Sequence, residues 1–167
     1  MKPRTMISMP TVTPIPPGYH SLSPFLMVSN VDGLLEFLRN AFDAQIIRRL
    51  PGPDGSTGHA EVRMGDSHLM LGDPMGQHPA RPGMLYFYVP KVDEVYKQAL
   101  QAGGTSISPP TDMFYGDRNA GVKDAWDNIW WIATHVEDVS EIEMERRNAE
   151  EMKKRASAGA IGSRSAS

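Results

Sequence analysis

The sequence predicts an α+β protein made of two copies of a strand–helix–strand–strand–strand (βαβββ) unit. The first observation is a repeat, because residues 27–32 match residues 88–93 and residues 65–71 match residues 126–132, each 61 positions later. The second is that strand and helix patterns follow in the same order in both halves. The third is a cleanly alternating hairpin in the first half. The shared V-x-x-V-D motif is short, so two ordinary strand-to-helix starts that look alike stay an alternative.

The repeat also sets the predicted domain boundaries. The chain has 167 residues, which is enough for one domain with a hydrophobic core. Residues 1–18 carry five prolines and no periodicity, which indicates a disordered arm. Small residues dominate 157–167, which indicates a disordered tail. Between them we expect a domain at 19–138, with unit one at about 21–73 and unit two at about 83–136, and then a C-terminal helix at 139–156.

The first unit begins with a short apolar strand at 21–29. Apolar residues at helical spacing then predict a helix at 31–42, and Asn30 before it is a suitable N-cap. A strand at 45–50 follows the helix, and the Pro- and Gly-rich residues 51–55 predict a turn.

A hairpin completes the first unit. Residues 59–64 alternate between polar and apolar, and Gly65–Asp66 is typical of a two-residue turn into a strand at 67–71. Such a turn places Glu61 opposite Met70 and Arg63 opposite His68, with directly opposed side chains about 5 Å apart at Cβ. The apolar face should pack on a helix. The other face is either a solvated sheet surface or a ligand-binding surface; it carries His59, Glu61, Arg63, His68 and Met70.

The second unit repeats this order, with a strand at 84–89 and a helix at 92–102 that ends at two glycines. A short strand at 105–108 should stop at the two prolines that follow it. Residues 115–135 then predict two strands joined by a turn at 124–128. The C-terminal helix has acidic residues first and basic residues last, which suits the helix dipole, but few large apolar residues. We therefore expect it to dock weakly or to reach a partner chain.

Composition excludes several classes of function. A net charge of −3 gives no electrostatic basis for binding nucleic acid. The chain has no cysteine, which excludes disulfides, zinc–thiolate sites and a thiol nucleophile and fits a reducing, cytoplasmic compartment. No apolar run reaches the length of about 18 residues that a membrane-spanning helix needs, so we expect no membrane partner. No sequence motif calls for a cofactor.

The duplicated unit resembles the vicinal oxygen chelate superfamily, which includes glyoxalase I, bleomycin-resistance proteins and extradiol dioxygenases. The chain is most similar to the PhnB-like, glyoxalase-like subgroup, over about residues 16–138. The resemblance implies the glyoxalase/bleomycin-resistance fold, in which the duplicated units form curved mixed sheets around a cavity, and it implies a homodimer. It covers both metalloenzymes and metal-free binding proteins. It is carried by the segments PGYHS at 17–21, PGPDG at 51–55, HAE at 59–61, FYGDR at 114–118 and ATHVED at 133–138.

The resemblance also implies where a metal would be held, because metal-dependent members use the first and last strands of each unit. Those positions are Ser23 and Met70 in the first unit and Met84 and Trp131 in the second. A methionine thioether suits soft copper(I) rather than the hard or borderline metals of these enzymes. We therefore predict no metal at this place. A relocated site made by His59, Glu61 and His68 stays an alternative.

The first functional hypothesis is a protein that binds a small organic molecule in an apolar cavity. Apolar and aromatic walls with a few convergent polar groups are typical of such pockets. Arg63 or Arg118 could hold a carboxylate or phosphate through two hydrogen bonds, although Arg118 could equally pair with a nearby carboxylate. Trp130 faces away from Trp131 and is expected in the core. The predicted lining residues are Phe25, His68, Met70, Met84, Tyr86, Tyr115 and Trp131.

The second hypothesis is an enzyme of this superfamily, an isomerase, lyase or dioxygenase, either without metal or with the relocated site. Glu61 would be the general base, with its pKa raised by apolar neighbours such as Met70, and His59 or His68 would move a proton. Arg63 or Arg118 would stabilise an enolate-like anion. A third hypothesis is an interaction module that uses the C-terminal helix as its partner surface.

Overall fold

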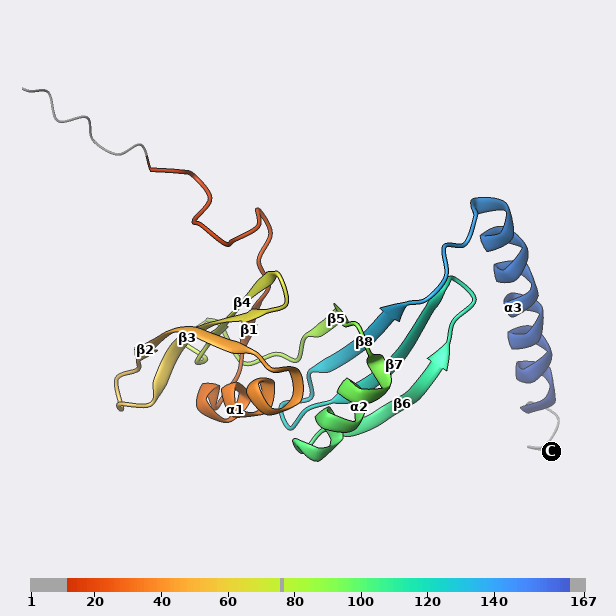
Figure 1. Cartoon of the computed structure of the whole chain (residues 1–167). Helices are drawn as coiled ribbons and strands as arrows, with labels where there is room; N and C mark the ends of the chain where they lie inside the picture. Colours follow the sequence, from red (N-terminus) through yellow and green to blue (C-terminus); the bar gives the residue numbers. More distant parts are fainter. Residues whose placement is uncertain (1–11, 76, 163–167) are drawn as a thin grey trace, which may run out of the picture.

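The computed structural model describes residues 12–75 and 77–162, with side chains up to residue 157. In these residues the chain forms eight strands and three helices (Figure 1). The elements are β1 (Phe25–Met27), α1 (Val31–Phe42), β2 (Gln45–Pro51), β3 (Thr57–Met64), β4 (Ser67–Gly72), β5 (Met84–Tyr88), α2 (Val92–Gln101), β6 (Thr105–Asp112), β7 (Asp117–Lys123), β8 (Ile129–His135) and α3 (Glu141–Gly162).

The two units have the same topology. The first sheet has the strand order β1-β4-β3-β2 and the second has the order β5-β8-β7-β6. In each sheet the first strand is parallel to the last strand of its unit, and the other neighbours are antiparallel. The predicted α+β fold with a duplicated βαβββ unit is therefore confirmed.

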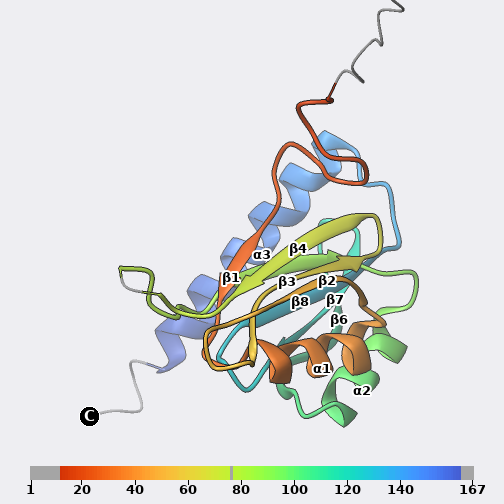
Figure 2. The ribbon, with the colours of Figure 1, turned by 90° about the vertical axis from the view of Figure 1, so that its left-hand side faces the viewer.

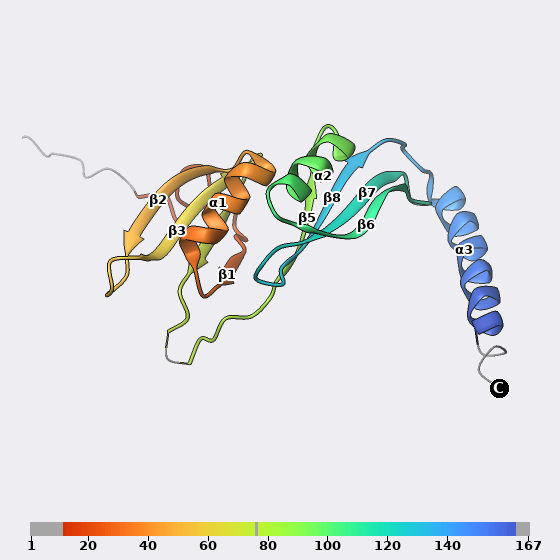
Figure 3. The same ribbon diagram turned by 90° about the horizontal axis from the view of Figure 1, so that it is seen from below.

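A helix covers one face of each sheet. Figure 2 shows α1 and α2 on the same side of the two sheets, and Figure 3 shows the two helices next to each other between the units. The core lies beneath them, where Leu34 and Leu38 of α1 are fully buried together with Leu71 of β4. Phe42 and Trp130 join the two units, with ring centroids 5.2 Å apart. Among the described residues, no helix covers the opposite face of either sheet.

The aspartate of the repeated motif ties each helix to its own sheet. Asp32 of α1 accepts hydrogen bonds from the backbone N–H of Thr57 at 3.0 Å and from its hydroxyl at 2.7 Å. Asp93 of α2 accepts two hydrogen bonds from Arg118, at 2.8 and 2.9 Å. The repeat thus preserves a structural contact that fixes the helix against the strands.

The two helices begin in different ways. The Asn30 side chain accepts from the backbone N–H of Gly33 at 2.9 Å, which confirms the predicted N-cap of α1. Lys91 stands before α2 and makes no side-chain cap. Instead, the Thr134 hydroxyl of β8 accepts from the backbone N–H of Val92 at 2.9 Å. A neighbouring strand therefore replaces the missing local cap.

The predicted hairpin is confirmed in its register. Met64 pairs with Ser67, Arg63 with His68 and Glu61 with Met70. Gly65 in the turn has φ of 58°, a left-handed conformation that favours glycine.

Three elements differ from their predicted bounds by more than two residues. Strand β1 covers only Phe25–Met27, and β6 continues through its two prolines to Asp112. The prolines are tolerated because β6 is an edge strand with register shifts beyond Ser106 and Ser108. Helix α3 reaches Gly162, inside the segment predicted as a tail. Residues 12–18 of the predicted arm have no helix or strand, while residues 1–11 and 163–167 lie outside the described residues.

Helix α3 projects away from the sheets (Figure 1). Arg147 of α3 donates two hydrogen bonds to Glu137, at 2.7 and 2.8 Å, and one to the backbone carbonyl of Phe114 at 3.4 Å. The apolar residues Ile142 and Met152 of α3 are exposed. Among residues 12–75 and 77–162, no helix is both long enough and apolar enough to cross a membrane.

The turn between β7 and β8 is built on the buried carboxylate of Asp124. It accepts hydrogen bonds from the backbone N–H of Trp126 and of Asn128, from the Asn128 amide and from the indole N–H of Trp130, each at 2.9 Å. Asn128 in turn accepts from the backbone N–H of Gly83 at 2.8 Å, at the start of β5. Asp127 follows in the left-handed conformation, with φ of 63°. One carboxylate therefore holds the turn, β5 and the Trp130 indole together.

We predict that Asp124→Ala lowers the free energy of unfolding by about 3 kcal/mol, because several buried donors lose their acceptor. Asp127→Asn is the control, since this exposed residue can keep its left-handed backbone as asparagine. Urea unfolding followed by tryptophan fluorescence measures both variants. A loss for Asp124→Ala no larger than that for Asp127→Asn would contradict this role.

Candidate functional site

The open face of the first sheet carries a carboxylate surrounded by three polar side chains. Glu61 on β3 is buried, with 8% of its surface exposed. Tyr19, from the segment before β1, donates a hydrogen bond from its hydroxyl to Glu61. His59 Nε2 lies 3.4 Å from Glu61 Oε1, and Arg48 Nη1 lies 3.6 Å from the same atom. We call Tyr19, Arg48, His59 and Glu61 the Glu61 group.

Local structure explains how the Glu61 group forms. His59 and Glu61 are two residues apart on β3, so their side chains share one face. Arg48 is the direct partner of Glu61 on β2. Tyr19 is 42 residues away in sequence and is brought in by the segment that crosses this face. His59 was predicted as a site residue from the alternating pattern, whereas Tyr19 and Arg48 were not.

The Glu61 group keeps its carboxylate ionised. The hydrogen bond from Tyr19 lowers the pKa of Glu61, and His59 and Arg48 add to this effect against the opposing influence of burial. The same hydrogen bond raises the pKa of Tyr19. The expectation that apolar neighbours raise the pKa of Glu61 was therefore wrong, because polar contacts outweigh desolvation.

Two depressions adjoin the Glu61 group. The larger has a volume of about 940 Å³ and is mostly apolar, with Phe25, His59 and Met75 among its lining residues. The smaller has a volume of about 530 Å³ and lies between the segment before β1 and the sheet. Glu61 and Met70 line the smaller one. Polar groups thus stand beside apolar walls, as in small-molecule sites.

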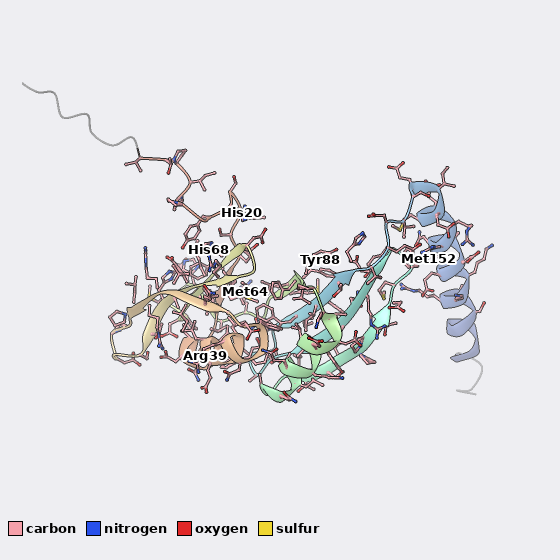
Figure 4. All side chains as sticks on the ribbon, viewed as in Figure 1. His20, Arg39, Met64, His68, Tyr88 and Met152 are labelled. Atoms are coloured by element: carbon pink, nitrogen blue, oxygen red, sulfur yellow. The ribbon has the colours of Figure 1, made fainter. Side chains whose placement is uncertain are left out.

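His68 is a buried neighbour of the Glu61 group. Its ring stacks on Tyr19, with centroids 4.1 Å apart and planes at 20°, and Figure 4 shows it below the segment that carries His20. Its Nδ1 atom is buried and has no hydrogen-bond partner in the part of the chain that the structure describes. Within those residues no three histidine, aspartate or glutamate side chains gather as a metal site would require. The proposed relocated metal site therefore has two of its three ligands in contact.

The four positions that the resemblance implies for a metal do not fit one. Ser23 offers a hydroxyl, Met70 and Met84 offer thioethers, and Trp131 has an indole N–H that can only donate. Met84 is also exposed, and Met70 stands directly between Phe25 and Glu61 in the sheet. Met70 therefore contributes to the apolar wall beside Glu61.

The open face of the second sheet carries a different polar group, centred on Asp117. This carboxylate is only 3% exposed. It accepts from the Tyr88 hydroxyl at 2.8 Å and from the Tyr86 hydroxyl at 3.2 Å, and His135 Nδ1 lies 2.8 Å away. The Asn119 amide extends this group, since it donates to the hydroxyls of Tyr115 at 2.7 Å and Tyr86 at 3.3 Å. We call Tyr86, Tyr88, Tyr115, Asp117, Asn119 and His135 the Asp117 group.

Only part of the Asp117 group was predicted from the sequence. Tyr86 and Tyr115 were predicted to bind a ligand, but Tyr88, Asp117 and His135 were not assigned to the site. A signal existed, because two tyrosines two residues apart on a strand must share a face. The pairing of Asp117 with His135 depends on the β7–β8 register, which was not worked out from sequence.

The Asp117 group contains two titratable side chains in direct contact, the Asp117 carboxylate and the His135 imidazole. Burial favours the neutral acid, but hydrogen bonds from His135, Tyr88 and Tyr86 outweigh it and lower the pKa of Asp117. The contact with Asp117, and a second one between His135 Nε2 and Asp138 at 3.0 Å, raise the pKa of His135. Burial is the main cause that raises the pKa of Tyr86. Both shifts favour the charged forms, so the contact between Asp117 and His135 stabilises an ion pair.

The structure divides the predicted lining residues between two surfaces. Phe25 and Met70 lie on the first sheet, whereas Met84 and Tyr86 lie on the second. Figure 1 shows the sheets side by side. Phe25 is 49% exposed, Tyr86 45% and Met84 72%, so one chain does not gather these residues into one enclosed cavity. Trp130 is 1% exposed, which confirms the prediction that it lies in the core.

The two predicted anion-binding arginines are engaged elsewhere. Arg63 is exposed and donates to Gln45 at 2.5 Å. Arg118 pairs with Asp93 through two hydrogen bonds and with Asp112 at 2.9 Å, so its role here is structural. Arg48 is the arginine that stands beside Glu61.

The sequence matches a known protein family and is similar to proteins of mycobacteria. The family model described as the glyoxalase/bleomycin resistance protein/dioxygenase superfamily matches residues 20–132. An uncharacterized protein of Mycobacterium bovis is 31% identical over 131 residues, which cover 72% of this chain and 86% of that protein. An uncharacterized protein of Mycobacterium tuberculosis is also 31% identical over 131 residues, 77% of its length.

Solved structures share the fold. TioX from Micromonospora sp. ML1 superposes with a TM-score of 0.60 at 22% identity, over 69% of this chain and 98% of that one. Lactoylglutathione lyase from Agrobacterium tumefaciens superposes with a TM-score of 0.56 at 18% identity, over 69% of this chain and 92% of that one. At these identities the likeness concerns the fold alone.

We predict a pH-dependent loss of stability for His135→Gln. Because the folded pKa of His135 is raised, its stabilising effect should be complete below about pH 6.5, the value in an unfolded chain, and should vanish as the pH rises through the folded value. Urea unfolding between about pH 5.5 and about pH 9 measures the difference from wild type. His78→Gln, an exposed histidine with no carboxylate partner among the described contacts, is the control. A difference that stays constant with pH would contradict the ion pair with Asp117.

Proposed function

The chain belongs to the glyoxalase/bleomycin resistance protein/dioxygenase superfamily, and we propose that it binds a small organic molecule without a metal at Ser23, Met70, Met84 and Trp131. The observation that carries this proposal is the Glu61 group, a buried carboxylate held by Tyr19, His59 and Arg48 beside an apolar depression. A closer relation to the PhnB-like subgroup is part of the proposal and is supported by the sequence segments described above.

The chemistry of the Glu61 group fits recognition of a ligand with a hydrogen-bond donor. Glu61 is ionised, so it can accept a hydrogen bond from a ligand hydroxyl or N–H in place of the one from Tyr19. Phe25 and Met75 supply apolar contact area in the larger depression. A charge-assisted hydrogen bond beside an apolar wall gives orientation and affinity together.

We further propose that two copies assemble so that the second sheet of one covers the first sheet of the other. Support comes from the apolar and aromatic side chains that each open face exposes in one chain. Tyr88 is 59% exposed and Met84 72% on the second sheet, and Phe25 is 49% exposed on the first. Exposed apolar and aromatic side chains gathered on a sheet face are typical of an interface or a ligand site.

The main test is a thermal-shift search with aromatic hydroxyl and amine compounds, followed by calorimetric titration of those that bind. We predict at least one binder whose affinity falls about tenfold or more in Glu61→Gln, because a charged acceptor is lost. Glu36→Gln, an exposed glutamate on α1, should leave the affinity unchanged. Sedimentation velocity in the same buffer reports whether two copies associate. Binding that is indifferent to Glu61→Gln would overturn the assignment of the site.

A second candidate function is catalysis by the same group, as an isomerase, lyase or dioxygenase. The chain Tyr19–Glu61–His59 favours it, since it links a hydroxyl, a carboxylate and an imidazole that can exchange a proton. The lowered pKa makes Glu61 a weak base while Tyr19 stays bound. Release of Tyr19 by a substrate would remove the main cause of that lowering.

The metal-dependent form of this alternative has its own test. Titration of the purified protein with zinc, nickel, manganese and iron(II) should show no one-to-one binding that depends on His59 and Glu61. The reason is that only these two of the candidate ligands are in contact. Tight binding that is lost in both His59→Ala and Glu61→Ala would replace the metal-free proposal with a relocated catalytic site.

A further inference from the structure

The second sheet presents three aromatic side chains next to a buried carboxylate. Tyr86 and Tyr88 stand at alternate positions of β5, and Trp131 is the direct partner of Tyr86 on β8. Gly121 on β7 pairs with Trp131, and a Cβ atom there would lie 3.0 Å from the indole ring. The missing side chain at Gly121 therefore makes room for the indole over the sheet.

The two tyrosine rings form a tilted pair and leave their faces open. Their centroids are 5.2 Å apart and their planes meet at 53°. Both hydroxyls donate to Asp117, so they are already occupied. Tyr86 is 45% exposed and Tyr88 59%, which leaves the ring faces as the surface that a ligand meets.

The charge around these rings is negative. Asp117 and Asp138 share a single imidazole, His135, so even a protonated His135 leaves one negative charge uncompensated. The cationic side chains of β7 do not offset it. Arg118 is paired with Asp93 and Asp112, and Lys123 is paired with Asp127 at 2.8 Å.

We propose that Tyr86, Tyr88 and Trp131, with Asp117 behind them, bind the charged group of an organic cation of the quaternary ammonium type. The faces of tyrosine and tryptophan rings attract cations, and the attraction grows when water is excluded. Asp117 already has three hydrogen-bonding partners, so a charge without N–H donors suits the site better than a primary amine. An anion would meet a buried carboxylate of the same sign.

This inference rests on the proposed function, because it names the chemical class of the small molecule that the protein binds. In the proposed assembly, the second sheet of one copy faces the Glu61 group of the other. Two ionised carboxylates, Glu61 and Asp117, would then flank one apolar and aromatic space. That arrangement favours a ligand with a positive charge on an aromatic body.

Three phenols of nearly equal shape and different charge test the inference. They are meta-hydroxyphenyltrimethylammonium, meta-tert-butylphenol and meta-phenolsulfonate, each titrated calorimetrically into the full-length protein. We expect the cation to bind at least about tenfold more tightly than the neutral isostere, and the sulfonate to bind most weakly.

Two variants test whether the preference for the cation depends on this site. Tyr88→Leu removes an exposed ring and should reduce the preference for the cation to about twofold or less. Tyr96→Leu is the matched control, because this tyrosine lies on α2 and donates to Ser106. The control should keep the full preference. Since Tyr88 is largely exposed, loss of folding is not expected to obscure the result.

The outcomes distinguish this inference from the proposed function. Equal affinity for the cation and the neutral phenol, or a preference that survives Tyr88→Leu, overturns the organic-cation inference alone if binding still depends on Glu61. No binding by any of the three phenols also overturns it. The proposed function fails separately, when the compound search finds no ligand that depends on Glu61.

Discussion

The structure depends on the buried carboxylate of Asp124 and the hydrogen bonds it accepts. Those bonds close the turn between β7 and β8 and orient the Trp130 indole into the core. Trp130 then packs on Phe42 of the first unit, with ring centroids 5.2 Å apart. A polar contact inside one turn thus helps to set how the two units meet. Burial makes this arrangement specific, because donors that lose their acceptor in the core have no water to replace it.

The two units share a scaffold but differ on their open faces. Asp32 and Asp93 both tie their helix to their sheet, although their donors differ. On the open faces the units diverge. Met70 is paired with Glu61 in the first sheet, whereas Trp131 is paired with Gly121 in the second. One unit therefore offers a carboxylate beside apolar walls, and the other offers an indole lying over a glycine.

Part of the candidate site could be predicted from the sequence, because it depends on local geometry. The two-residue turn at Gly65 fixed the partners of β3 and β4, so Glu61 and Met70 were correctly placed together. The pKa of Glu61 could not be predicted in this way. The direction of its pKa shift is set mainly by the hydrogen bond from Tyr19. Tyr19 lies 42 residues away in sequence, and no periodic pattern connects it to Glu61.

By itself, the sequence determined the duplicated βαβββ fold, the helix at Val31–Phe42 and the hairpin register, since apolar periodicity and turn chemistry act over a few residues. Only the tertiary structure decided which polar groups meet. It placed Tyr19 on Glu61 and His135 on Asp117, and it divided the predicted lining residues between two open faces. The physical reason is that hydrogen bonds between distant segments depend on how whole sheets pack, and packing is a property of the complete fold.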